Sequence, residues 1–272
     1  MTHTPTWDPG QYQRFATSRL RPALYLLRQV ALTDPATVCD LGCGDGRVTW
    51  LIAERWARAR LLGLDSSSEM LDDARGRAAE HPAERAARIE WRHGDIRTWC
   101  PNGRFDLIFS NAVLHWVDES HTPLLRRLAS YLRGAGSCLA IQVPVNWDQS
   151  SHRLIGESLR ALGLPDDRVA PALRWAERDW VNHRDSYYHA LADVAADVEI
   201  WTTEYLHPLA GADPVFEWLK GSALRPVLAA LQPDDRERFS SSYRKRLREA
   251  YPPTPTGATL FPFRRLFILA TL

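Results

Sequence analysis

The chain has 272 residues, of which 45% are hydrophobic and 25% are charged, and its formal net charge is +1 at pH 7. This length suits one large domain, or one domain with an inserted cap. The 34 basic and 33 acidic residues form no extended run of like charge, which argues against nonspecific nucleic-acid binding. The four cysteines form no C-x-x-C pair, so their spacing predicts no metal site. No stretch reaches the roughly 18 apolar residues of a membrane span, and we expect a cytoplasmic protein with reduced cysteines.

Residues 1–30 are predicted to form an N-terminal cap segment. The segment opens with polar and aromatic residues and leads into a helix that Pro22 begins, because proline is tolerated in the first helical turn. Arg19 and Arg21 lie just before this proline. Most arginines in such places are simply exposed to solvent.

A strand, a glycine turn and a helix follow one another in the stretch TVCDLGCGDGRVT, residues 37–49. Such a turn lets a ligand approach the backbone and leaves amides at the helix N-terminus ready for polar or anionic groups. We therefore expect a nucleotide-containing cofactor. The dinucleotide fingerprint needs a third glycine where Arg47 stands, which disfavours a pyrophosphate and with it an NAD-dependent oxidoreductase.

Strands and helices then alternate through the first half of the chain. Four further apolar strands are predicted at residues 60–65, 89–95, 105–111 and 137–144. A helix that Ser66 or Ser67 caps follows the first of these strands. This alternation predicts an α/β fold with a doubly wound, mostly parallel sheet covered by helices on both faces.

Four successive strands end on a small acid or amide. These residues are Asp40, Asp65, Asp95 and Asn111. Ligands of such sheets bind outside the carboxyl ends of the strands, and carboxylates are rare in a core. Together the four residues favour ligand binding, and Asp65 is placed to hold the ribose hydroxyls of an adenosine group.

The second half of the chain departs from this alternation. Residues 146–185 are predicted as an inserted cap segment without clear periodicity after a short helix. A core helix and a sixth strand occupy 186–206, and 207–260 form a helical cap insertion that includes a charged helix over 233–251. The final core strand lies within 261–272. The cofactor-binding half of the core is thus expected in residues 31–145.

The motifs DLGCGDG, LLGLDSS, HGDIRTW, FDLIFSNAVLHWV and LRGAGSCLAIQVP, in this order, resemble the class I S-adenosylmethionine-dependent methyltransferases. The resemblance implies a Rossmann-like sheet of seven strands whose last strand is antiparallel and lies beside the sixth. It also implies that the glycine loop faces the methionine part, Asp95 and Ile96 contact the adenine, and Asn111 lies near the methionine amino group. The implied cofactor residues are Asp40, Gly42, Cys43, Gly44, Gly46, Asp65, Ser66, Gly94, Asp95, Ile96 and Asn111. S-adenosylhomocysteine would be the product of the cofactor.

A narrower likeness covers nearly the whole chain, through pieces such as WDPGQYQRF, IQVPVNWDQSSH, SYYHAL, GSALRP and FPFRRLFILA. These pieces are similar to members of the class that form the monomethyl ester of a small tricarboxylate. The likeness implies a polycarboxylate substrate, for which the planar guanidinium of arginine is well suited. The candidate substrate residues are Arg19, Arg21, Arg225, Arg264, Arg265, His115, Trp147, Tyr187 and Tyr188. His152 is a weaker candidate, and packing is the simpler explanation for each aromatic residue and histidine.

No catalytic side chain is predicted for such a reaction. A carboxylic acid with a pKa near 4 is already ionised at neutral pH, so a carboxylate nucleophile needs no general base, and catalysis reduces to positioning. One alternative is a methyltransferase for another small acid or for a hydroxyl metabolite, in which His115 or His152 would act as the base. A noncatalytic S-adenosylmethionine-binding regulator is a second alternative. The sequence does not predict the oligomeric state.

Overall fold

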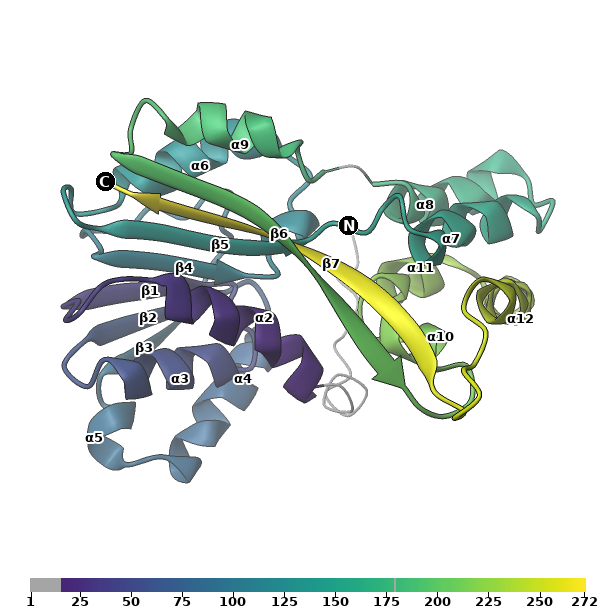
Figure 1. Ribbon diagram of the computed structural model, residues 1–272, viewed down its shortest axis with the longest axis horizontal. Helices are drawn as coiled ribbons and strands as arrows, with labels where there is room; N and C mark the ends of the chain where they lie inside the picture. The colour runs from purple at the N-terminus through teal and green to yellow at the C-terminus, as the bar shows by residue number, and fades with distance from the viewer. Residues whose placement is uncertain (1–15, 179) are drawn as a thin grey trace. The chain divides into compact units, whose positions relative to one another are not determined.

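The computed structural model describes residues 16–178 and 180–272. Its centre is a seven-stranded sheet with the strand order β3-β2-β1-β4-β5-β7-β6 (Figure 1). The strands are β1 (Thr37–Leu41), β2 (Arg60–Asp65), β3 (Ile89–His93), β4 (Leu107–Asn111), β5 (Cys138–Pro144), β6 (Asp197–Leu209) and β7 (Thr259–Thr271). The first five strands pair in parallel, and β7 pairs with β5 in the antiparallel direction. The predicted α/β class and the antiparallel last strand beside the sixth are confirmed.

The chain divides into two compact units. The sheet unit comprises Arg19–Pro144, Trp180–Thr203 and Arg265–Leu272, and the helical unit comprises residues 16–18, 145–178 and 204–264. Strands β6 and β7 contribute residues to both units. The segments predicted as insertions, 146–185 and 207–260, supply the helices of the helical unit.

Helices lie on both faces of the sheet in the sheet unit. Its helices are α2 (Ala16–Gln29), α3 (Arg47–Arg55), α4 (Ser68–Gly76), α5 (Ala83–Ala86), α6 (His121–Ser130) and α9 (Arg184–Leu191), with the 3₁₀ helices η1 (Arg77–Glu80) and η2 (Leu114–Trp116). The crossover from β1 to β2 runs along the sheet in one direction, and that from β4 to β5 runs in the other. Because such crossovers are right-handed, α3 and α6 lie on opposite faces, as the doubly wound prediction requires. Helices α6 and α9 pack side by side (Figure 1).

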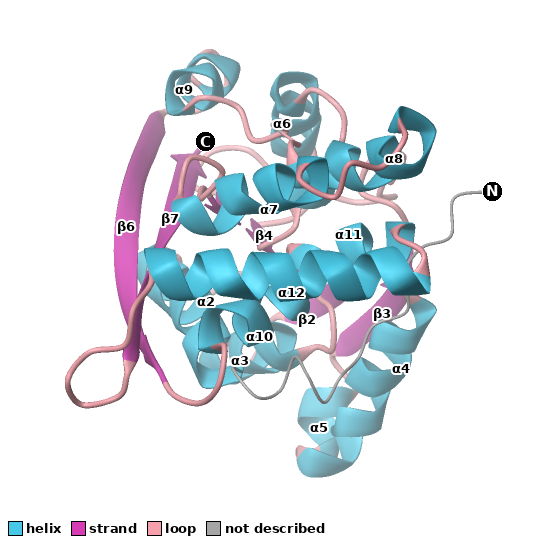
Figure 2. Ribbon diagram, turned by 90° about the vertical axis from the view of Figure 1, so that its right-hand side faces the viewer, coloured by secondary structure: helices cyan, strands magenta, loops and turns pink. Residues whose placement is uncertain are grey.

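The helical unit has its own hydrophobic core. It contains α7 (Ser150–Arg160), α8 (Asp166–Ala176), α10 (Pro214–Lys220), α11 (Leu224–Ala230) and α12 (Pro233–Ala250). Figure 2 shows α7 running alongside α12. The core of this unit includes Leu159, Trp218, Leu224 and Phe239, each at most 1% exposed.

Two sequence predictions about helices are wrong. Helix α2 begins at Ala16, so Pro22 lies inside it and does not start it. A proline removes a single backbone donor, and here the turns before and after it are long enough to continue the helix. Residues 166–176, predicted without periodicity, form α8, whose Val169, Ala172 and Ala176 are buried on one face. Pro171 and the many charged residues hide this spacing in the sequence.

The predicted cap of the helix after β2 is confirmed. Ser67 precedes α4, and its hydroxyl accepts a hydrogen bond from the amide of Met70 at 3.2 Å. Every residue of β5 is buried, as expected for a central strand covered on both faces. Within the described residues, no helix combines the length and apolar character needed to cross a bilayer.

Candidate functional site

The glycine loop joins β1 to α3, and strand β2 holds its backbone. The amides of Gly42 and Cys43 both donate to the carbonyl oxygen of Leu64, at 2.7 and 3.0 Å. Gly42 and Gly44 have φ angles of 69° and 56°, in the left-handed region that other residues rarely adopt. The loop is therefore fixed in a conformation that depends on glycine.

The space beside the Cα atom differs among the three loop glycines. A Cβ atom on Gly42 would lie 2.1 Å from Val113 Cγ2, and one on Gly46 would lie 2.7 Å from the ring of Trp91. At both positions the protein itself fills the space. Among the described residues, a Cβ on Gly44 would meet only the end of a flexible methionine side chain, at 3.1 Å. Gly44 is thus the loop position that is most open to a bound molecule.

Asp65 ends β2 and ties the glycine loop to the start of α4. Its carboxylate accepts hydrogen bonds from the amide of Gly44 at 2.8 Å and from the amide of Ser67 at 2.9 Å. Burial raises the pKa of the Asp65 carboxyl, and these amides oppose the shift. Each carboxylate oxygen carries two lone pairs, so both can accept a further hydrogen bond from a ribose hydroxyl. Ser66, the next residue, is exposed.

Asp40 lies inside β1, directly beneath the loop. Its carboxylate accepts a hydrogen bond of 2.6 Å from the hydroxyl of Thr49 on α3, and only 2% of the residue is exposed. Burial raises the pKa of Asp40 to about 7, and the negative charge of Asp65 adds to the shift. Burial also raises the pKa of the Cys43 thiol. In this structure both side chains serve the packing of the loop.

The turn after β3 contains the predicted cofactor residues Gly94, Asp95 and Ile96. Arg97 Nε lies 3.0 Å from both carboxylate oxygens of Asp95 and lowers the pKa of that carboxyl. Arg127 of α6 donates to the carbonyl oxygens of Ile96 and Arg97, at 2.7 and 2.6 Å. Contacts from Arg97 and from Arg127 therefore fix the conformation of this turn. An adenine amino group bound by Asp95 would share its carboxylate with Arg97.

The turn after β4 carries backbone strain and an unpaired acceptor. Ala112 has a φ of 59°, an unfavourable value for a residue with a side chain, and its amide donates to the carbonyl oxygen of Gln142 at 2.8 Å. The preceding Asn111 is half-buried, and its Oδ1 atom is buried without a hydrogen-bond partner among the described residues. Such an atom can accept a hydrogen bond from an amino group of a ligand.

Two of the predicted substrate arginines lie near one aromatic contact of the sheet unit. Tyr25 of α2 packs edge-on against Phe267 of β7, with ring centroids 5.3 Å apart. Arg21 lies one turn before Tyr25, and Arg265 lies two residues before Phe267, opposite Pro144 at the end of β5. Figure 1 shows α2 and β7 running in the same direction. Arg265 is 7% exposed. The side chain of Arg19 lies outside the described residues.

The other predicted substrate residues of the sheet unit differ in exposure. Tyr187 is fully buried, where its hydroxyl lies 2.7 Å from His121 Nδ1 and accepts a hydrogen bond from the amide of Asn182 at 3.1 Å. These contacts give Tyr187 a clear packing role. Tyr188 is 50% exposed, and His115 is buried in η2.

The remaining candidates lie in the helical unit. The main chain of Arg264 is held by Asn146, which accepts at Oδ1 from the Arg264 amide at 2.7 Å and donates from Nδ2 to the Arg264 carbonyl at 3.0 Å. The side chain of Arg264 pairs with Asp148. Arg225 is half-buried in α11. The rings of Trp147 and His152 lie 5.7 Å apart.

Sequence reasoning missed Arg178, a buried cation in the helical unit. Its guanidinium lies 5.8 Å from the ring of Trp147 and 5.9 Å from that of Trp175, and 5% of the residue is exposed. Burial lowers the pKa of Arg178 to about 10. Burial, followed by the charge of Arg178, lowers the pKa of His152 to about 3, so this imidazole is neutral at pH 7. The signal in the sequence is the pair of tryptophans near Arg178, Trp175 three residues before it and Trp180 two residues after it.

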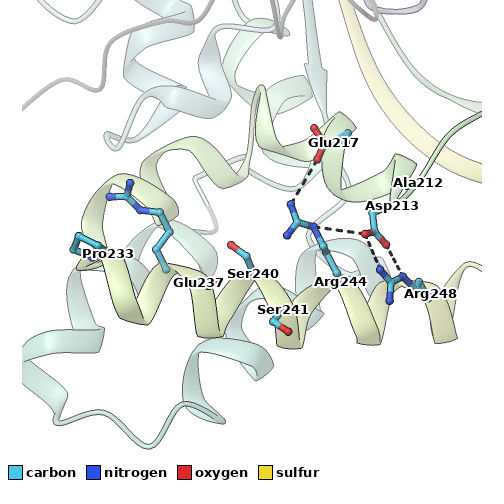
Figure 3. A pocket seen from close by; sticks show the side chains of 10 residues that line it. Ala212, Asp213, Glu217, Pro233, Glu237, Ser240, Ser241, Arg244 and Arg248 are labelled. Carbon is cyan, nitrogen blue, oxygen red and sulfur yellow. Dashed lines mark hydrogen bonds and ion pairs between the residues drawn. The ribbon is translucent and has the colours of Figure 1, made fainter.

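A hollow lined by charged residues lies elsewhere, between α10 and α12. It has a volume of about 760 Å³, and Figure 3 shows its charged lining. Arg248 donates from Nε and Nη2 to Asp213 at 2.6 and 2.8 Å, and Arg244 lies 3.7 Å from Glu217. These charges pair with one another, which gives them a structural role in joining the two helices. Across residues 16–178 and 180–272, no three His, Cys, Asp or Glu side chains gather in a way that could hold a metal ion.

Comparisons with known proteins agree with this architecture. A family model described as a methyltransferase domain matches residues 38–136. Among solved structures, the YcgJ protein of Bacillus subtilis aligns with 92% of this chain and 98% of its own, at 14% identity and a TM-score of 0.59. A geranyl diphosphate C-methyltransferase of Streptomyces coelicolor, in complex with S-adenosyl-L-homocysteine, aligns with 100% of this chain and 91% of its own, at 17% identity and a TM-score of 0.51. At these identities the two likenesses show the shared fold.

Curated relatives cover both units. The trans-aconitate 2-methyltransferase of Streptomyces avermitilis is 46% identical over 98% of this chain and 97% of its own length. The enzyme of the same name from Azoarcus sp. is 42% identical over 98% of this chain and 99% of its own length. Identity at this level over the full length of both chains establishes common membership. The chain belongs to the family of the trans-aconitate 2-methyltransferases.

Proposed function

We propose that this protein transfers the methyl group of S-adenosylmethionine to one carboxylate of trans-aconitate, giving a monomethyl ester and S-adenosylhomocysteine. The observation that carries the proposal is the 46% identity to a trans-aconitate 2-methyltransferase over 98% of the chain. This identity extends through the helical unit as well as the glycine loop. The proposal therefore covers the acceptor as well as the methyl donor.

The residues of the sheet unit fit S-adenosylmethionine as the cofactor. Gly44 leaves space beside the loop, the Asp65 carboxylate retains lone pairs for ribose hydroxyls, and Asn111 Oδ1 is an unpaired buried acceptor. The proposed cofactor residues remain those of the glycine loop, the ends of β2 and β4, and the turn after β3. When bound, the cofactor supplies a methyl group on a positively charged sulfur, which makes that methyl carbon electrophilic.

The acceptor needs no activation by the protein. A carboxylate of trans-aconitate is ionised at neutral pH and forms the new O–CH₃ bond directly, while the electron pair of the broken bond stays on sulfur. The low pKa of His152 agrees with this view, because a nitrogen that titrates near pH 3 is a weak base. The contribution of the protein is therefore orientation, which can lower a barrier by roughly 7 to 11 kcal/mol at most.

Arginines are proposed to hold the two carboxylates that do not react. A guanidinium on the attacking carboxylate would withdraw charge from the nucleophile. We assign the clamping role to Arg21 and Arg265 of the sheet unit. Arg19, Arg225 and Arg264 stay predictions from the sequence.

The test is incubation with S-adenosylmethionine and separate organic acids, followed by mass spectrometry of the products. A methyl ester of trans-aconitate supports the proposal. A methylated product from another acid alone would redirect it to that acid, and cofactor binding without any product would favour a regulator. The cytoplasmic location stays a prediction from the cysteine usage.

A further inference from the structure

The side chain of Gln142 is a polar group enclosed in the apolar strand β5. The residue is 0% exposed, and neither Oε1 nor Nε2 has a hydrogen-bond partner among the described residues. An unpaired buried polar group lowers folding stability, and an apolar residue at this position would avoid that loss. The amide therefore needs an explanation other than the stability of the free protein.

The strand register identifies the polar neighbour of Gln142. In the sheet it lies between Asn111 on β4 and Phe267 on β7. Residues in register on adjacent strands point to the same face, about 4.8 Å apart. Phe267 is covered by the ring of Tyr25 and stacks on Trp201, with centroids 5.1 Å apart, so this side offers aromatic surface. Asn111 is the register neighbour that offers an amide.

The unpaired atoms of these two amides are complementary. Gln142 has an unpaired donor at Nε2, and Asn111 has an unpaired acceptor at Oδ1. The main chain already joins the two positions, because the Gln142 carbonyl oxygen accepts from the amide of Ala112 at 2.8 Å and so holds the strained turn after Asn111. The contact between this donor and this acceptor requires a change of side-chain rotamer.

We propose that Gln142 is a positioning residue whose amide donates to Asn111 Oδ1 when ligands are bound, and so fixes the orientation of the Asn111 amide. Asn111 Oδ1 has two lone pairs, one for Gln142 and one for the amino group of S-adenosylmethionine. A neutral amide does this without adding charge near the nucleophile. The inference rests on the proposed function, because it assigns the ligand donor to this cofactor.

The test compares the affinity for S-adenosylmethionine, measured by calorimetry, with the melting temperature. Gln142→Met keeps the length of the side chain and removes both polar atoms, and Gln142→Leu is the second variant. We expect affinity to fall about fivefold, as for one lost hydrogen bond, while the melting temperature is unchanged or higher. In an Asn111→Ala background, Gln142→Met should cause no further loss.

A matched control is Ser158→Ala, which removes a buried hydroxyl of the helical unit that has no partner in the described chain. It should leave the affinity unchanged. Equal affinity of the wild type and both Gln142 variants, or additive losses in the Asn111→Ala background, would overturn the inference alone. Failure of the wild-type protein to bind S-adenosylmethionine would overturn the proposed function and the inference together.

Discussion

Val113 occupies the space that a side chain at Gly42 would need, since a Cβ there would lie 2.1 Å from Val113 Cγ2. The contact joins the turn after β4 to the loop after β1. We predict that Gly42→Ala lowers the free energy of unfolding by roughly 2 kcal/mol or more, because an alanine with positive φ and a filled site both cost energy. Urea unfolding measures this change.

Two variants separate the causes of that loss. Gly42→Ala with Val113→Ala should recover part of the stability, because the clash is removed and only the backbone strain remains. Gly44→Ala should cost less stability than Gly42→Ala, yet it should weaken S-adenosylmethionine binding, because the loop is open at this position. A Gly44→Ala protein with wild-type affinity would contradict the assignment of the loop.

Replacement of Asp65 should reduce cofactor affinity. In Asp65→Ala the amides of Gly44 and Ser67 lose their acceptor, and the proposed contact with the ribose hydroxyls is lost. Hydrogen bonds to charged groups contribute about 1.5 to 3 kcal/mol, so we expect a loss of roughly 10- to 100-fold in affinity by calorimetry. Asp72→Ala, which removes an exposed partner of Arg75 on α4, is the control and should bind normally. Equal affinity for both variants would refute the role of Asp65.

Asp40 should give folding stability an unusual dependence on pH. Burial raises the pKa of its carboxyl from 3.8 to about 7 in the folded protein. The unfolded state therefore loses this proton first, and the contribution of Asp40 is complete below pH 3.8 and falls as the pH rises towards 7. Over this pH range the contribution of Asp40 to the free energy of unfolding changes by on the order of 4 kcal/mol. In Asp40→Asn this fall should be absent, while the hydrogen bond from Thr49 can remain.

The comparison of the wild type with Asp40→Asn isolates this group. Asp95, Asp106 and Asp148 have lowered pKa values and produce the opposite slope in both proteins. If the free energies of unfolding of the wild type and Asp40→Asn change in parallel from pH 4 to pH 7, the pKa of Asp40 is not raised by folding.

Arg265 should govern binding of the acceptor. We predict that Arg265→Leu raises the KM for trans-aconitate by roughly 10- to 100-fold, as expected for a lost charge-assisted hydrogen bond, and leaves S-adenosylmethionine affinity intact. Arg265→Lys keeps the charge without the planar fork and should be intermediate. Arg126→Leu, which breaks an exposed pair with Asp193, is the matched control. An unchanged KM in Arg265→Leu would remove Arg265 from the substrate site.

Much of the fold follows from local patterns in the sequence. The apolar runs of β1, β2, β4 and β5 and the glycines between β1 and α3 predict a parallel doubly wound sheet. The limits of β7 are less visible, because the strand begins at Thr259, two residues before the predicted segment 261–272. Those first residues alternate buried and exposed positions, and tertiary packing rather than local propensity extends the strand.

The sequence likewise predicts some features of the candidate site and misses others. Asp65 and Asn111 end their strands as predicted, whereas Asp40 lies within β1 and Asp95 lies two residues beyond β3. The role of Gln142 is invisible in the sequence because a single amide in CLAIQVP acquires meaning only through its register with Asn111. Arg178 is likewise one arginine among many until its burial beside Trp147 is known.

The most direct test of the proposed function is the mass of the product. The protein is incubated with S-adenosylmethionine and trans-aconitate at neutral pH, and the acid is then analysed by mass spectrometry. We predict a product heavier than trans-aconitate by one methylene group, formed with an equal amount of S-adenosylhomocysteine. Unmodified trans-aconitate, under conditions in which the protein binds S-adenosylmethionine, would contradict the assignment.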